Sequence, residues 1–217
     1  MPYISPEERR NTYRQALGND AGECLRLLEN KLYSIRRDWL VYKGMFGTSE
    51  SRVDILNSIS GLVTWTVERT MWDSIALRLA HFAYPTGGKD ETLSLDRLTH
   101  LVHTDNWSDA DREAYRTKRK YVRRLLGEFE PIRNKVLAHA DYEVVANGYQ
   151  GIYRASRSHI DDTIRNLEEL LDLIRKASGL MTIVNDIADA QIEEAICAFF
   201  GAIAANDDMD TENEVIG

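Results

Sequence analysis

An arginine, an amide and a histidine lie close together in the stretch Pro131-Ile132-Arg133-Asn134-Lys135-Val136-Leu137-Ala138-His139-Ala140-Asp141. Arginine carries a permanent planar charge and can hold a phosphate through two hydrogen bonds. Histidine titrates near neutrality and can therefore transfer a proton, and Asn134 can orient either group. Together these residue types suit the cleavage of a phosphodiester without a metal.

The same spacing has an ordinary structural interpretation, because an arginine near the start of a helix and a histidine near its end are common. On an ideal helix Arg133 and His139 are separated by about 120° around the axis and about 9 Å along it. Their side chains converge only if Arg133 reaches along the groove, or if the helix ends near Ala138 and His139 turns inward. Asp141 could support such an ending.

A dense basic block precedes this motif. It consists of Arg116, Lys118, Arg119, Lys120, Arg123 and Arg124. A run of this kind usually marks a solvated helix face. Here, however, Arg116, Lys120 and Arg123 follow the spacing i, i+4, i+7 and share one face, and that face leads along the chain toward Arg133. We therefore expect the block to contact nucleic acid.

Composition limits the class of protein. The chain has 217 residues, a formal net charge of −8, 13 glycines and 4 prolines, which favours a mostly helical globular protein with one substantial core. The negative charge argues against non-specific coating of DNA but allows a local basic groove. No stretch resembles a signal peptide or a membrane-spanning helix, so we expect a cytoplasmic protein with no membrane partner.

Two further groups of residues could do chemistry, and each has a plainer interpretation. His100 and His103 could share a metal ion, but no cysteine or second carboxylate has ligand-like spacing. We expect two partly exposed surface histidines, with no metal and no cofactor. Cys24 and Cys197 lie in apolar helical patterns, so buried thiols are expected rather than a disulfide or a nucleophile.

The apolar periodicity predicts helices over most of the chain, at about 5–18, 19–42, 48–83, 93–104, 108–130, 158–176 and 180–204. Pro131 either kinks the fifth helix or opens a new one. The longest helix carries an apolar stripe, so we expect it to be buried against more than one neighbour, with Trp65 and Trp72 in the core. The stripe consists of Leu56, Ile59, Val63, Val67, Met71, Ile75 and Leu79.

Two segments do not fit the helical pattern. Asn147-Gly148 between β-branched and aromatic residues indicates a small β-hairpin or a structured loop over 143–153. The acidic segment 205–217 is expected to be a disordered tail. Because no linker divides the rest, we expect a single helical domain over residues 1–204.

The order R-N-x-x-x-x-H at 133–139 resembles the signature of the HEPN superfamily, and the string RNKVLAHAD resembles its AbiU2-like branch. The resemblance extends to Trp39 and Tyr42, to 71–73 and to the leucine-rich segment 93–98, and it covers about residues 39–176. One departure concerns the end of the long helix. An Arg-Leu element is expected there, and the chain reads Leu79-Ala80-His81-Phe82; if that arginine supports the active site in relatives, this chain lacks it.

The resemblance implies an all-α, HEPN-like bundle of long antiparallel helices that forms a homodimer, with two motif copies facing a shared cleft. It also implies a metal-independent endoribonuclease that acts as a toxin or phage-defence effector, with an antitoxin protein as a partner. Arg133, Asn134 and His139 would then be catalytic. The RNA-binding residues would be Arg116, Lys118, Lys120, Arg123 and Lys135. The alternative is a non-catalytic HEPN-like module that binds RNA, a nucleotide or a protein.

Overall fold

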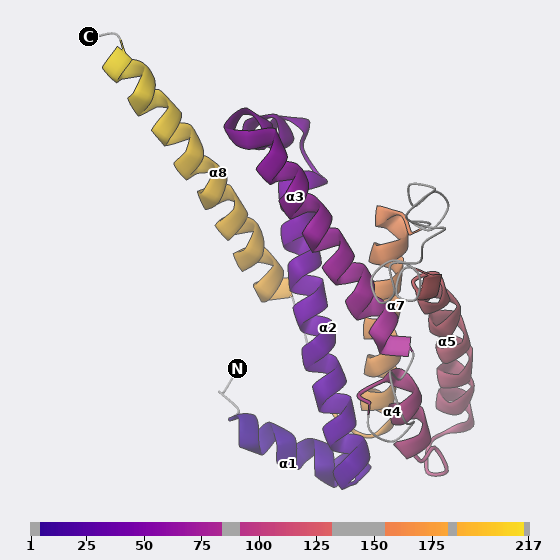
Figure 1. Ribbon diagram of the computed structural model, residues 1–217. Coiled ribbons are helices and arrows are strands. Elements are labelled where there is room, and N and C mark those ends of the chain that lie inside the picture. Colours follow the sequence, from indigo (N-terminus) through magenta and orange to yellow (C-terminus); the bar gives the residue numbers. More distant parts are fainter. Residues whose placement is uncertain (1–4, 84–91, 132–154, 182–185, 215–217) are drawn as a thin grey trace. The chain divides into compact units, whose positions relative to one another are not determined.

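The computed structural model describes residues 5–83, 92–131, 155–181 and 186–214, with side chains of the last range given for 189–205. These residues form seven helices and no strand (Figure 1). The predicted all-α fold is confirmed. The hairpin or loop predicted over 143–153 lies outside the described residues.

Serine caps set most of the helix starts. The helices are α1 (Pro6–Leu17), α2 (Asn19–Phe46), α3 (Glu50–Ala83), α4 (Leu95–Leu101), α5 (Asp109–Gly127), α7 (Arg157–Ala177) and α8 (Asp186–Glu214). At the start of α1, the Ser5 hydroxyl accepts a hydrogen bond from the Glu8 amide and Glu8 accepts one from the Ser5 amide, which is a complete capping box. The hydroxyls of Ser94, Ser108 and Ser156 likewise accept from the amides of Arg97, Asp111 and His159 and so cap α4, α5 and α7.

The predicted boundaries of two helices were wrong. Helix α2 continues past the expected end at Tyr42 to Phe46. Helix α8 begins at Asp186 and not near Leu180, and it extends to Glu214 and not only to Ala204. Leu180 instead closes α7, because its amide donates to the Arg175 carbonyl at 2.9 Å after Gly179 turns the chain at a φ of 72°, a conformation that favours glycine.

The chain divides into two compact units. Unit 1 comprises Met1–Ile35 and Asp73–Ile183, and unit 2 comprises Arg36–Trp72 and Val184–Gly217. Helices α2 and α3 are each divided between the two units, so each unit combines segments that are distant in sequence. The predicted organisation, with one domain over 1–204 and a tail over 205–217, therefore stays a prediction.

Unit 1 is built around an antiparallel pair of helices, α5 and α7. Lys118 of α5 donates to Asn166 of α7 at 3.0 Å, and the His159 ring at the start of α7 lies 3.0 Å from the Leu125 carbonyl near the end of α5. The inner side of α7 is mostly apolar at helical spacing, and it also contains the buried polar residues Thr163, Asn166 and Arg175. Its buried apolar residues are Ile160, Ile164, Leu167, Leu170, Leu171 and Ile174.

A buried charge cluster joins α1, α2 and α7 within unit 1. Glu29 of α2 is 8% exposed, accepts a hydrogen bond from the Tyr13 hydroxyl at 2.5 Å, and lies 3.2 Å from the Arg175 guanidinium. Arg9 adds a longer contact at 3.3 Å, and Arg175 also faces Asp172. Burial raises the pKa of Glu29, and burial together with the Glu29 charge raises the pKa of Tyr13 to about 12. Removing one partner would leave a buried charge unpaired.

Unit 2 contains an aromatic cluster between α2 and α3. Trp39 stacks on Tyr42 with ring centroids 5.1 Å apart and meets Trp72 of α3 edge-on at 6.1 Å. The Tyr42 hydroxyl donates to Glu68 of α3 at 3.0 Å. Because Trp39 meets Trp72 while the later Tyr42 meets the earlier Glu68, the two helices run antiparallel. The core position predicted for Trp72 is consistent with these contacts.

The stripe predicted along α3 is buried at only part of its length. Helix α3 is interrupted at Ser60, whose φ of −168° and ψ of 105° are extended, and whose hydroxyl accepts from the Val63 amide at 3.4 Å. Leu56, Ile75 and Leu79 are buried. The expectation of burial was wrong for the residues around the interruption, and Trp65 is not in the core. The exposed residues are Ile59, Leu62, Val63, Trp65 and Val67.

Helix α8 packs against the end of α2 and the start of α3. A side-chain carbon added at Gly44 would meet the Ile196 side chain at 2.3 Å, so glycine is what permits the close approach. The Arg52 guanidinium lies 5.3 Å from the centre of the Phe200 ring. Cys24 is buried as predicted, and burial raises the pKa of its thiol to about 11, but Cys197 is exposed. Its burial was predicted wrongly because α8 turns only one side toward its neighbours.

Candidate nucleic-acid interface

Helix α5 is strongly amphipathic, and its sequence explains why. The Ser108 hydroxyl accepts from the Asp111 amide at 3.1 Å, with acidic residues in the first turn and Arg124 in the last, which matches the helix dipole. Its apolar side is directed into unit 1. The buried residues are Tyr115, Val122, Leu125 and Leu126. The opposite side is therefore left to solvent and carries the cations.

Four cations form one exposed surface on α5, which we call the α5 basic face. They are Arg116, Lys120, Arg123 and Arg124. The continuous helix confirms that Arg116, Lys120 and Arg123 share a side, as their spacing predicts. Within the part of the chain that the structure describes, Arg116 and Lys120 have no ion-pair partner. Their charges are thus available to a polyanion.

The other two predicted contacts on α5 are already engaged. Lys118 is turned toward α7, where its ammonium bonds Asn166 at 3.0 Å and also Glu169. Arg123 pairs with Asp96 of α4 at 3.1 Å while its side chain remains about half exposed. Lys118 therefore ties the two helices together, and its role in RNA binding stays a prediction.

Tyr121 follows Lys120 on α5 and is 38% exposed. The Arg124 guanidinium lies 4.8 Å from the centre of its ring. An exposed aromatic ring beside cations is a surface on which an unpaired base can stack. The signal that could have revealed it is helical spacing, because Tyr121 lies one residue after Lys120 and three before Arg124 and therefore borders the side that carries the cations.

Arg133, Asn134, Lys135 and His139 lie outside the described residues, but the two ends of the segment that contains them are described. Helix α5 ends at Gly127, and helical backbone resumes at Glu130 and Pro131, so Pro131 begins a new helical turn and does not kink α5. After the segment, Ser156 caps α7. Phe129 and His159 join the two ends, with ring centroids 5.2 Å apart.

An arginine does occur near the end of α3, where one was thought to be missing. Arg78 directly precedes Leu79, so an Arg-Leu pair is present, and its guanidinium donates to the Ser34 hydroxyl of α2 at 2.8 Å. Nearby, the Lys31 ammonium donates to the His81 carbonyl at 3.3 Å and lies 5.1 Å from the Phe82 ring centre. Burial, together with the Arg78 charge, lowers the pKa of Lys31 to about 8.

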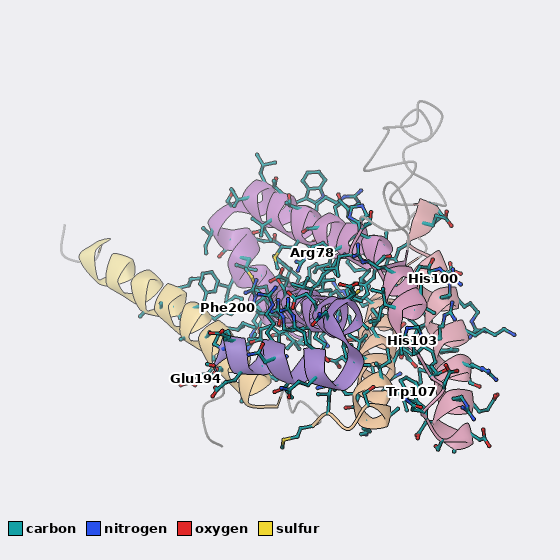
Figure 2. The ribbon with its side chains drawn as sticks, turned by 90° about the horizontal axis from the view of Figure 1, so that it is seen from below. Arg78, His100, His103, Trp107, Glu194 and Phe200 are labelled. Atoms are coloured by element: carbon teal, nitrogen blue, oxygen red, sulfur yellow. The ribbon has the colours of Figure 1, made fainter. Side chains whose placement is uncertain are left out.

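His100 and His103 do not form a helical pair. Helix α4 ends at Leu101, so His103 lies beyond it, and both side chains are exposed (Figure 2). No group of three potential metal-ligating side chains occurs among the described residues. His103 instead lines a pocket of about 320 Å³ in unit 1. The other lining residues are Ala16, Leu17, Asn106, Trp107, Ala177 and Ser178. This pocket includes no residue of the α5 basic face.

Comparison with curated proteins and with solved structures gives no match. None of the helices in the described ranges combines the length and the apolar character that crossing a membrane requires. A protein-family model described as AbiU2, of the HEPN type, matches residues 19–195. The match begins earlier and ends later than the resemblance seen in the sequence, and it includes the start of α2 and part of α8. Because it covers most of the 217 residues, the chain belongs to the AbiU2 family of HEPN proteins.

Proposed function

We propose that this protein is a metal-independent endoribonuclease that binds RNA on the α5 basic face and cleaves it at the motif Arg133-Asn134…His139. The observation that best supports this proposal is the arrangement of residues on α5. Its outer side presents Arg116, Lys120, Arg123 and Arg124 together with an exposed Tyr121. The chain then passes from the end of this helix into the motif within a few residues. RNA bound to α5 would thus lie near the point at which the chain enters the segment that carries the catalytic groups.

The proposed chemistry uses the 2′-hydroxyl of the RNA as the nucleophile. This oxygen attacks the adjacent phosphorus, the bond to the 5′-oxygen of the next nucleotide breaks, and a 2′,3′-cyclic phosphate and a 5′-hydroxyl are formed. His139 transfers a proton from the attacking oxygen or to the leaving oxygen. Arg133 neutralises the charge that develops on the phosphate, and Asn134 holds the phosphate or orients His139.

A homodimer completes the proposed site. Two copies of the motif would face one cleft, and the α5 basic face of each copy would guide RNA toward it. A polyanion is attracted to such a surface even though the whole chain carries a net charge of −8, because screening confines charge interactions to about 8–10 Å at physiological salt. A role as a toxin or phage-defence effector, with an antitoxin protein as a partner, belongs to this proposal.

The enzyme proposal is tested by His139→Ala. We expect RNA cleavage in EDTA by the wild-type protein and its loss in the variant, because His139 is the proton-transfer group of the motif. His103→Ala is the matched control, since His103 is an exposed histidine outside the motif, and it should cleave RNA at the wild-type rate. Equal rates for His139→Ala and the wild type would contradict the assignment of His139.

A second candidate is a HEPN-like module that binds RNA without cleaving it. The pairing of Arg124 with the exposed Tyr121 ring favours this candidate as much as the enzyme, because stacking supports binding whether or not cleavage follows. RNA that binds with strong salt dependence but remains intact after prolonged incubation would identify this function.

A further inference from the structure

We propose that the exposed apolar stretch of α3 around Ser60, in unit 2, is the surface through which two copies of this chain associate. The residues that define it are Ile59, Leu62, Val63, Trp65 and Val67, which we call the α3 apolar face. Their exposures are 59%, 75%, 60%, 63% and 37%. The inference deepens the proposed function, because it rests on the dimer that the shared cleft requires.

The face is free of charge over an unusual length. No Asp, Glu, Lys or Arg occurs from Ile55 to Val67, the longest such run in the chain, and the next longest, Ala195–Asn206, lies in α8 of the same unit. Helix α8 uses Ile196 and Phe200 toward its neighbours, and Figure 2 labels Phe200 there. Unit 2 therefore contains both of the chain's longest charge-free helical runs.

Three hydroxyls along this part of α3 are already paired inside the helix. The Thr66 hydroxyl donates to the Leu62 carbonyl and the Thr70 hydroxyl to the Thr66 carbonyl, each at 2.8 Å. Thr64 likewise donates to the Leu56 carbonyl at 2.8 Å across the interruption at Ser60. Covering this side would therefore leave these three hydroxyls paired, so the cost of burying unpaired polar groups is small.

The size of the face fits an interface between proteins. A fully buried aromatic side chain covers about 150–250 Å², so Trp65 at 63% exposure presents on the order of 100–150 Å². With its four aliphatic neighbours the face reaches several hundred Å², the range of the largest apolar patch on a monomer. That is a large part of the roughly 800 Å² that each partner contributes to a standard interface.

Charge selects a second copy as the occupant. Two chains that each carry a net charge of −8 repel one another, and a contact made through a charge-free surface brings the fewest like charges together. A twofold dimer pairs the same surface with itself, which an uncharged apolar surface permits. A lipid surface is disfavoured, because the run is bounded by Asp54 and Glu68, both acidic, and anionic membranes attract basic segments.

The test is Leu62→Glu combined with Trp65→Glu in the full chain. We expect sedimentation to show twice the chain mass for the wild type at micromolar concentration and a monomer for the variant, with the dissociation constant raised at least a hundredfold. Met181→Glu is the matched control, because Met181 is an apolar side chain of unit 1 with 79% exposure, and it should remain a dimer. All three proteins should show the same helical content, since the substituted side chains are largely exposed.

RNA cleavage measured on the same samples separates this inference from the proposed function. A variant that remains dimeric overturns the interface and leaves the ribonuclease proposal intact. A wild-type protein that is monomeric at every concentration overturns the interface, and its cleavage of RNA then decides the ribonuclease proposal by itself. If both proposals hold, the monomeric variant binds RNA on the α5 basic face but has lost cleavage, because its two motif copies no longer share a cleft.

Discussion

Helices α5 and α3 present opposite kinds of surface to solvent. The inner side of α5 is apolar and buried, and its outer side carries four exposed cations. The part of α3 around Ser60 is apolar on its outer side and carries no charge for thirteen residues, Ile55–Val67. Helix α5 buries most of its apolar residues within its own unit, whereas α3 leaves the apolar residues around Ser60 exposed. From these two outer surfaces we propose a polyanion as the partner of α5 and a second apolar surface as the partner of α3.

Reversing charge on the α5 basic face should have the largest effect on RNA binding. Arg116→Glu with Lys120→Glu removes two cations that have no ion-pair partner in the described part of the chain, so the fold should be unaffected. We expect affinity to fall at least tenfold at moderate salt. The slope of log affinity against log salt should decrease by roughly 1.4, at about 0.7 for each lost phosphate contact. Filter binding of a single-stranded RNA across a salt series measures both.

Arg37→Glu with Arg165→Glu is the control for this experiment. Both arginines have half or more of the side chain exposed, and both lie outside α5, so the change in net charge is the same. This control should lose little affinity and keep its slope. If the salt is a sulfate, raising its concentration should strengthen dimerisation through the α3 apolar face and weaken RNA binding, because sulfate promotes apolar association and screens contacts with phosphate. Equal slopes for the two double variants would mean that α5 is only a solvated surface.

Removing the exposed ring on α5 should have a smaller effect. Tyr121→Ala is expected to weaken RNA binding by about 1 kcal/mol, roughly fivefold, because it removes one stacking surface. The salt slope should stay unchanged, since no cation is lost. Tyr121→Phe, which retains the ring, should bind like the wild type. Loss of binding by Tyr121→Phe would show that the hydroxyl and not the ring makes the contact.

The last expected effect concerns stability in alkali and leaves RNA binding aside. The pKa of Lys31 is lowered to about 8 in the folded protein from 10.5 in the unfolded chain. Between these values the unfolded chain binds more protons, so the free energy of unfolding rises as the pH increases from about 8 to 10.5, at roughly 1.4 kcal/mol per pKa unit. Lys31→Met should remove this rise. Urea unfolding at pH values below, within and above the window measures it.

Lys43→Met is the matched control for the alkaline experiment. The Lys43 ammonium lies 5.8 Å from the Trp39 ring centre in unit 2, and its replacement should leave the rise in place. Tyr13, whose pKa is raised to about 12, acts with the opposite sign above pH 10 in every variant and therefore cancels in the difference. A rise that persists in Lys31→Met would assign it to another group.

Much of the fold could be predicted from local pattern. Serine followed by acidic residues identified the starts of α1 and α5, and the repeat of apolar residues in α7 identified its inner side, because caps and periodicity depend on neighbours in sequence. The exposure of Trp65 and Cys197 could not be predicted. Apolar periodicity indicates that one side of a helix will be covered by another apolar surface. Whether that surface belongs to the same chain depends on contacts between segments that are distant in sequence.

The candidate site was predictable to a similar extent. The shared side of Arg116, Lys120 and Arg123 follows from helical spacing alone. The engagement of Lys118 with α7 depends on Glu169, which is distant in sequence, so no local pattern reveals it. An Arg-Leu pair, Arg78-Leu79, can also be read from the sequence at the start of the segment Leu79-Ala80-His81-Phe82. The roles of Arg133, Asn134, Lys135 and His139 stay predictions that the His139→Ala experiment addresses.

The buried carboxylate of Glu29 also constrains how the chain is made. Its closest cation among the α7 residues is Arg175, which follows it by 146 residues. At about 5–20 residues per second, Arg175 leaves the ribosome roughly 7–30 s after Glu29. Until then, packing α1 onto α2 would enclose a carboxylate without its main counter-charge. Stable packing of α1 onto α2 is therefore expected to follow the synthesis of α7, the last helix of unit 1.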